Sequence, residues 1–166
     1  AWLVGRVQPA SDEEAAQLLG DHTFDLEQVA LLPPDLLAGA EEMGASGPYS
    51  VTLARPAPNR IDVSLNSAPG GLLVVSENWM PGWHLLDPDP QSPISSLQSP
   101  ISGLQPLTIY RADLTLLAVP VPAGVTHFAL VYWPESVRNG LLISAGMAVL
   151  LVIAVGWRWW AKGAAW

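Results

Sequence analysis

Three histidines are the side chains best suited to metal binding or acid–base chemistry. Their spacing does not match a metal site or an acid–base motif. They are His22, His84 and His127, and no two stand in the HxH or HExxH spacing of a metal site. His127 alternates with apolar residues, which predicts a packed or rim position on one face of a strand. His84 follows Gly82-Trp83 and is a candidate for the lining of a cleft.

The carboxylates and hydroxyls show no catalytic motif. Glu77 and Asp113 are a conceivable acid–base pair, but nothing in the sequence brings them together. The run 87–90, Asp-Pro-Asp-Pro, lacks the glycine and further oxygens of a calcium loop and predicts a solvated turn. GxSxG, Walker A and GxGxxG motifs are absent, and so is cysteine. We therefore expect no catalytic residues, no cofactor and no metal.

Tryptophans provide the remaining candidate contacts. Trp79, Trp83 and Trp133 are compatible with a sugar-stacking platform, although packing in a core explains them as well. With His84, Trp79 and Trp83 are the candidates for contact with a carbohydrate or a protein partner.

The composition limits the class of protein. The chain has 166 residues, which suits one domain or one domain with an appendage, and 50% of them are hydrophobic. Only 13% are charged, against about 25% in an ordinary soluble domain. The formal net charge of −8 opposes contact with phosphates, so no nucleic-acid partner is expected.

The most apolar segment predicts a transmembrane helix at 138–160, followed by a cytoplasmic tail at 161–166. Gly140 to Trp157 is free of charge, and a helix of that length rises about 27 Å, close to the ~30 Å hydrocarbon core. A buried core helix is the alternative, but in so small a chain it would show a polar face. The expected membrane-interface anchors are Trp157, Arg158, Trp159 and Trp160.

The span also carries a stripe of small residues. Gly140, Ser144 and Ala148 recur every four residues, so they share one helix face, and small residues let helix backbones approach closely. We expect this face to dock on a neighbouring transmembrane helix of another subunit or of a missing upstream portion of the chain.

The charge bias around the span predicts its orientation. Two basic and no acidic residues follow the uncharged run that ends at Trp157, whereas residues 1–138 hold five basic and fifteen acidic residues. This favours a cytoplasmic C-terminus and an acidic domain on the periplasmic or extracellular side. Because no signal peptide precedes Ala1, we expect a processed chain or a piece of a longer one.

Residues 1–45 are predicted to form an opening strand and short helices. The chain begins with an apolar Trp2-Leu3-Val4 strand signal, and Ser11 and Glu14 form a capping-box pair at the start of a helix that Gly20 ends. A second short element is expected at 24–32, before Pro33-Pro34.

Residues 46–137 are predicted to form an antiparallel β-sandwich. Ile61, Val63 and Leu65 alternate with polar residues, as in a half-buried strand. With turn signals between them, six or seven short strands are expected, and a closed barrel would need more. The later strands are expected at 72–75, 83–86, 107–111, 114–119 and 125–133. The fold class is thus mainly β, with a short N-terminal α/β segment and one C-terminal transmembrane helix.

A tandem repeat interrupts this region at 91–105. A seven-residue unit, QSPISSL, is followed by QSPISGL, and its Ser-Pro content argues against a core strand. We expect an expanded hairpin loop that tolerates shortening.

A series of short motifs runs through most of the chain. They are Ala1-Trp2-Leu3-Val4, Phe24-Asp25, Asn59-Arg60-Ile61, the run from Pro69 to Trp79, Pro81-Gly82-Trp83, the run from Ala118 to Gly124, Tyr132-Trp133-Pro134 and the run from Gly140 to Ser144. In their order and spacing these pieces resemble the C-terminal part of the YfhO-type bacterial membrane proteins. A departure lies at 87–90, where the tight Asp-Gly turn usual in that family is replaced.

The resemblance implies an extracytoplasmic β-domain and the last transmembrane helix of a polytopic protein in the bacterial cytoplasmic membrane. Such proteins are similar to glycosyltransferases that use lipid-linked sugars, but the catalytic residues so implied lie in helices outside this chain. We expect a non-catalytic accessory or scaffold subunit of a membrane complex. The alternatives are the substrate-side domain of a lipid-linked-sugar glycosyltransferase and a carbohydrate-binding module.

Overall fold

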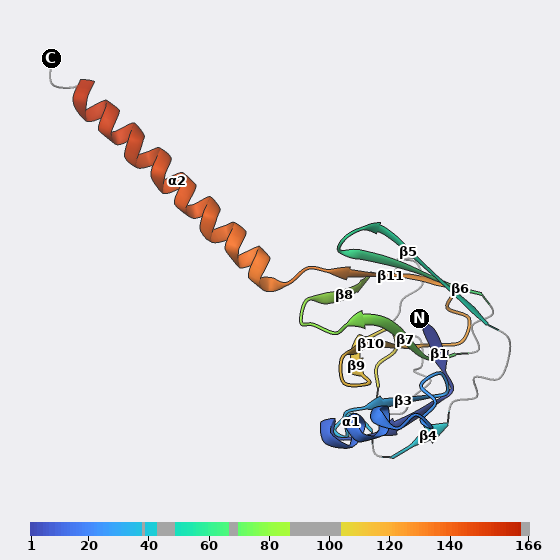
Figure 1. Cartoon of the computed structure of the whole chain (residues 1–166). Coiled ribbons are helices and arrows are strands. Elements are labelled where there is room, and N and C mark those ends of the chain that lie inside the picture. Colours follow the sequence, from blue (N-terminus) through green and yellow to red (C-terminus); the bar gives the residue numbers. More distant parts are fainter. Residues whose placement is uncertain (38, 43–48, 67–69, 87–103, 164–166) are drawn as a thin grey trace. The chain divides into compact units, whose positions relative to one another are not determined.

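A computed structural model describes residues 1–37, 39–42, 49–66, 70–86 and 104–163 (Figure 1). The chain divides into two compact units, Ala1–Tyr132 and Trp133–Trp166. The Asp-Pro turn at 87–90 and the tandem repeat up to residue 103 lie outside the described residues.

The first unit is built from eleven described strands and one helix. In chain order they are β1 (Trp2–Val4), β2 (Arg6–Pro9), α1 (Asp12–Gly20), β3 (Val29–Leu32), β4 (Glu41–Glu42), β5 (Ser50–Ala57), β6 (Arg60–Asn66), β7 (Gly71–Asn78), β8 (Trp83–Leu86), β9 (Tyr110–Ala112), β10 (Leu116–Val121) and β11 (His127–Tyr132). The second unit holds α2 (Glu135–Gly163).

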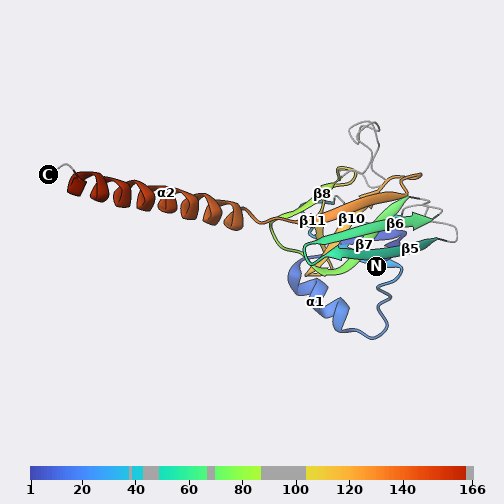
Figure 2. The same cartoon turned by 90° about the horizontal axis from the view of Figure 1, so that it is seen from above.

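The strands form three sheets with the orders β1-β7-β10-β9, β5-β6-β11-β8 and β3-β2-β4. All pairings in the two larger sheets are antiparallel, and β2 with β3 is the parallel pair. Figure 1 shows the β1-β7-β10-β9 sheet between the other two, and Figure 2 shows strands of the two larger sheets running in similar directions. The predicted fold class, mainly β with antiparallel sheets and one C-terminal apolar helix, is confirmed.

The middle sheet is buried on both faces, which explains the unbroken apolar run of β7. Leu73 and Val75 pack into a cluster that also contains Val63 and Phe128 of the β5-β6-β11-β8 sheet. Leu72 and Val74 point the other way, into a cluster shared with the small sheet. Successive side chains of a strand point to opposite faces, so one strand contributes to two cores.

Two local predictions are confirmed in detail. The alternation in β6 places Ile61, Val63 and Leu65 in the core. In α1 the Ser11 side chain accepts a hydrogen bond from the Glu14 backbone, and the Glu14 side chain accepts one from the Ser11 backbone. The capping box therefore begins the helix where the sequence predicts it.

Two predictions about elements are wrong. Residues 29–32 form β3 rather than a short helix, because they pair in parallel with β2. The strands expected at 107–111 and 114–119 begin three and two residues later, at Tyr110 and Leu116, and the positive φ angles of Leu107, Asp113 and Leu114 interrupt extended backbone there. The six or seven strands expected in residues 46–137 are confirmed, since β5 to β11 are seven strands among the described residues of that region.

Candidate functional site

Helix α2 is the feature with the clearest functional meaning. It has 29 residues, which correspond to about 44 Å, enough to cross a bilayer with its headgroup layers. The segment Glu135–Ile153 has a mean hydropathy of 1.8, and none of it is buried. The described chain thus holds one helix that is long and apolar enough to cross a membrane.

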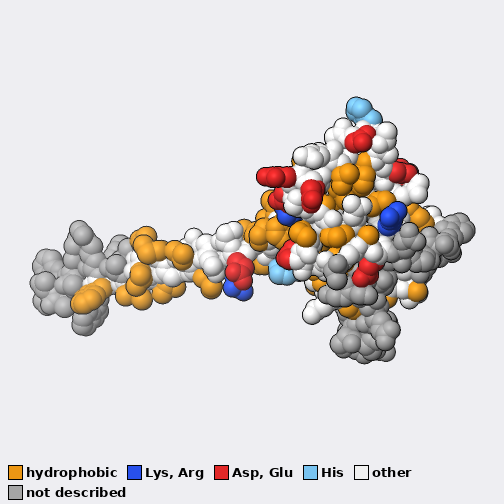
Figure 3. Space-filling view, turned by 90° about the horizontal axis from the view of Figure 1, so that it is seen from below, with side chains coloured by type: hydrophobic (Ala, Val, Ile, Leu, Met, Phe, Trp, Pro, Cys, Tyr) orange, Lys and Arg blue, Asp and Glu red, His pale blue; other side chains and the backbone are white. Residues whose placement is uncertain are grey.

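The apolar side chains of α2 surround the helix. Residues 149–153 are all apolar, and each is more than half exposed. Consecutive helical residues are about 100° apart, so five in a row cover every direction. Figure 3 shows this mainly hydrophobic surface along α2, while acidic side chains are scattered over the other unit. A helix apolar on all sides suits lipid better than water.

The predicted docking and anchoring residues all belong to α2. Gly140, Ser144 and Ala148 are exposed, and a side-chain carbon added at Gly140 would meet open space. Trp157 is 69% exposed, and Arg158, Trp159 and Trp160 continue the same helix. Helix docking at the first three residues and interface anchoring at the last four stay predictions.

Two of the three candidate tryptophans, Trp79 and Trp83, belong to the first unit. Trp83, at the start of β8, is half-buried with its ring centroid 5.3 Å from that of Tyr132, and its Nε1 donates to the Asn78 carbonyl at 3.2 Å. Trp79 stands in the loop before β8 and is 37% exposed, whereas Trp133 begins the second unit. Trp83 thus packs partly against the core, and Trp79 is an exposed ring. Contact of Trp79, Trp83 and His84 with a carbohydrate or a partner stays a prediction.

The histidines stand apart from any acid–base partner set. His84 is exposed on β8, next to Trp83. His127 is exposed at the rim of β11, where its Nδ1 lies 3.4 Å from the Ser64 hydroxyl. Within the described ranges, no group of three His, Asp or Glu side chains is placed to hold a metal ion.

Glu77 and Asp113 have separate partners. The Glu77 carboxylate accepts a hydrogen bond from Arg55 at 2.6 Å. Asp113 lies between β9 and β10, where its Oδ1 accepts from the Leu31 backbone at 2.8 Å and its own backbone N–H donates to the Leu31 carbonyl at 2.9 Å. The acid–base pair considered from the sequence is therefore two separate structural contacts.

The burial of Asp113 is the feature that sequence reasoning missed. Its side chain is only 5% exposed, and Oδ2 has no hydrogen-bond partner among the described atoms. Burial raises the pKa of its carboxyl group, and the hydrogen bond from Leu31 opposes that rise. Its φ of 48° places it in the left-handed region, which Asp tolerates better than most residues. The sequence signal that could have indicated this burial is the position of Asp113, in an Ala-Asp-Leu turn between two apolar strands.

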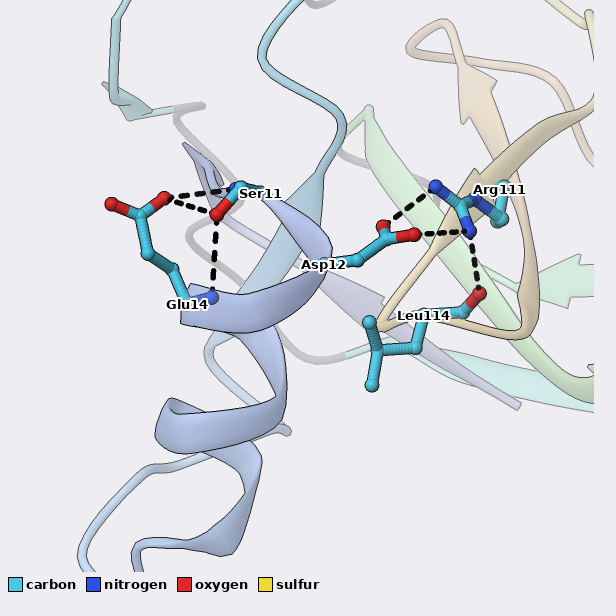
Figure 4. A network of polar contacts seen from close by, with 5 residues as sticks. All are labelled: Ser11, Asp12, Glu14, Arg111 and Leu114. Atoms are coloured by element: carbon cyan, nitrogen blue, oxygen red, sulfur yellow. Dashed lines mark hydrogen bonds and ion pairs between the residues drawn. The ribbon is translucent and has the colours of Figure 1, made fainter.

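A polar network joins α1 to the β9–β10 turn (Figure 4). Arg111 forms a bidentate salt bridge with Asp12, in which Nη2 donates to Oδ1 at 2.8 Å and Nη1 donates to Oδ2 at 3.3 Å. Nη1 also lies 3.4 Å from the Leu114 carbonyl. Ser11 and Glu14 complete the network on the other side of the helix start. This arrangement fixes the position of α1 and contains no activated nucleophile.

A surface pocket of about 390 Å³ lies beside α1, lined in part by Gln8, Glu14, Gln17 and Asp21. Hydrogen bonds from Ser11 lower the pKa of Glu14, and hydrogen bonds from Thr23 lower that of Asp21. Both carboxylates are therefore ionised near neutral pH, which suits structural acceptors and not general acids.

Comparison with known proteins gives no match for this chain among family models, curated proteins or solved structures.

Proposed function

We propose that the chain is a non-catalytic β-domain, anchored by α2 in a membrane, that serves as an accessory or scaffold unit of a larger membrane complex. One observation carries the proposal: a folded three-sheet unit continues directly into a long helix whose apolar residues are exposed on every side. Such a surface is costly in water and favourable in lipid.

The proposed partner is a neighbouring transmembrane helix, and the proposed contact face is Gly140, Ser144 and Ala148. In lipid, helix association relies on close packing, and bulky side chains on the face prevent it. Replacing Ser144 and Ala148 with Leu should therefore release the chain from its complex while leaving it in the membrane.

The control variant adds bulk on the opposite face of the helix. Gly146→Leu places a leucine about 160° away from both tested positions, at 100° per residue. Recovery of the complex on native gels after mild detergent extraction is the measurement. Loss with the double variant and retention with the control supports the proposal. Equal recovery of both overturns the docking face.

A second candidate is the substrate-side C-terminal domain of a YfhO-type polytopic protein related to lipid-linked-sugar glycosyltransferases. Its support is the ordered series of motifs from Asn59 to Ser144, ending in the span. Intact mass of the native chain and co-purification discriminate the two: a single long polytopic parent favours this candidate, and separate membrane subunits favour the scaffold.

The proposed orientation places the β-domain on the periplasmic or extracellular side of a bacterial cytoplasmic membrane and the C-terminus in the cytoplasm. The two basic residues after the span, without acidic ones, support this orientation.

A further inference from the structure

The loop between β7 and β8 exposes apolar side chains at a place where loops are usually polar. Trp79 is 37% exposed and Met80 45% exposed, and Pro81 after them is exposed as well. An exposed indole beside an exposed thioether costs free energy in water unless another surface covers them.

The loop is held in place. The Trp79 backbone N–H donates to the Thr115 carbonyl at 2.6 Å, and the Trp83 indole closes the loop base by its bond to Asn78. Gly82 has a φ of 117°, a conformation that other residues rarely adopt. The two apolar side chains are therefore displayed by a fixed turn.

The covalent chain limits how far this loop can lie from the start of α2. Trp83 pairs with Tyr132, the last residue of β11, and only two residues separate Tyr132 from Glu135, where α2 begins. Three Cα–Cα steps reach at most about 11 Å. The charge-free segment begins at Gly140, roughly 7 Å further along the helix. If α2 spans a bilayer, the loop end of the sheet is tethered close to the headgroup layer.

Three carboxylates at this end of the sheets are paired with arginines. Three of the four arginines in residues 1–132 lie here, each opposite a carboxylate. The pairs are Arg55 with Glu77, Arg60 with Asp62, and Arg111 with Asp12. In a chain with a net charge of −8, each arginine offsets the repulsion between its partner carboxylate and an anionic surface.

We propose that the β7–β8 loop inserts Trp79 and Met80 into the headgroup–acyl boundary of the membrane that α2 spans. Indoles favour that boundary, where the ring meets apolar chains and the N–H meets polar groups. The inference rests on the proposed anchoring by α2, and it assigns the exposed tryptophan to lipid in place of a sugar or a protein.

The test uses the absence of cysteine from the chain. Single variants Met80→Cys, Leu26→Cys and Met147→Cys carry an environment-sensitive fluorophore in the full chain. The protein is reconstituted into phosphatidylcholine–phosphatidylglycerol vesicles that contain a nitroxide lipid quencher at headgroup-proximal or mid-bilayer depth. Leu26 has the same 37% exposure as Trp79 and is the control for surface position, while Met147 reports on α2.

The headgroup-proximal quencher should quench the fluorophore at position 80 at least roughly twofold more strongly than the fluorophore at position 26. The reason is that the proposal places position 80 in the headgroup–acyl boundary, where this quencher lies. The deep quencher should act on position 147. Quenching at 147 with equal, weak quenching at 80 and 26 overturns the loop contact alone. Absence of quenching at 147 overturns the anchor and this inference with it. A label at Pro81→Cys repeats the measurement should Met80→Cys fail to fold.

Discussion

At the scale of single residues, Asp113 shows how a buried carboxylate can tie two parts of a fold together. Its backbone and its Oδ1 both bond Leu31 of β3, so the β9–β10 turn holds the small sheet against the middle one. The cost is a second oxygen without a partner in a buried place.

This arrangement predicts a specific pH dependence. The pKa of Asp113 in the folded chain lies above its ordinary value of 3.8, so the folded state binds the proton more tightly than the unfolded state. The resulting stabilisation is fully present below 3.8 and is lost as the pH rises through the folded pKa. Asp113→Asn keeps an oxygen acceptor for Leu31 and removes the charge.

We therefore expect Asp113→Asn to gain stability relative to the wild type at neutral pH and to lose that advantage in acid. Denaturant unfolding of the detergent-solubilised chain across this pH range measures the difference. Parallel stability curves for the two proteins would contradict a raised pKa. Asp113→Ala, which leaves the Leu31 N–H without an acceptor, should cost about 1–3 kcal/mol.

At the scale of elements, the meeting of β1 and β7 depends on a glycine. Gly71 has a φ of 155°, and a side-chain carbon there would lie 2.9 Å from the Val4 carbonyl oxygen. This oxygen belongs to the backbone, so it cannot move away unless β1 itself shifts.

Gly71→Ala should therefore destabilise the first unit by about 1–3 kcal/mol, the usual cost of overpacking or a strained backbone. Gly20→Ala is the matched control, since an added carbon there meets nothing within 4 Å. Both are measured as the free energy of unfolding. A Gly71→Ala protein as stable as the control would show that β1 shifts freely.

The helix α1 gives a second prediction at this scale. Ser11→Ala removes the cap that accepts from the Glu14 backbone and should cost about 1 kcal/mol. Glu13→Gln, a change on the same helix at a residue outside the capping box, should leave stability nearly unchanged. Equal effects of the two substitutions on the unfolding free energy would contradict a role for the capping box.

The sequence predicted an element well where the interactions that form it join residues close together in the chain. The alternation in β6, the bounds of β8 and the capping box of α1 follow from residues within one turn or one strand. The parallel pairing of β3 with β2 and the burial of Asp113 against Leu31 join residues distant in sequence, and no local pattern encodes them. For that reason the parallel strand at 29–32 and the burial of Asp113 were not predicted.

At the scale of the whole molecule, the proposed function combines a β-rich unit with an apolar helix that anchors it in a membrane. The sequence predicts the helix because eighteen uncharged residues in a row have few other uses. It does not predict the exposed Trp79–Met80 loop, because exposure is decided by the pairing of Trp83 with Tyr132 and of Trp79 with Thr115.

The central claim, that α2 crosses a membrane with the β-domain outside, is tested most directly by the sidedness of single cysteines. Leu26→Cys and Ala161→Cys are treated with a membrane-impermeant maleimide in right-side-out and inside-out vesicles from producing cells. We predict labelling of position 26 only in right-side-out vesicles and of position 161 only in inside-out vesicles. Labelling of both positions from the same side would contradict a spanning helix, and the reverse pattern would contradict the proposed orientation.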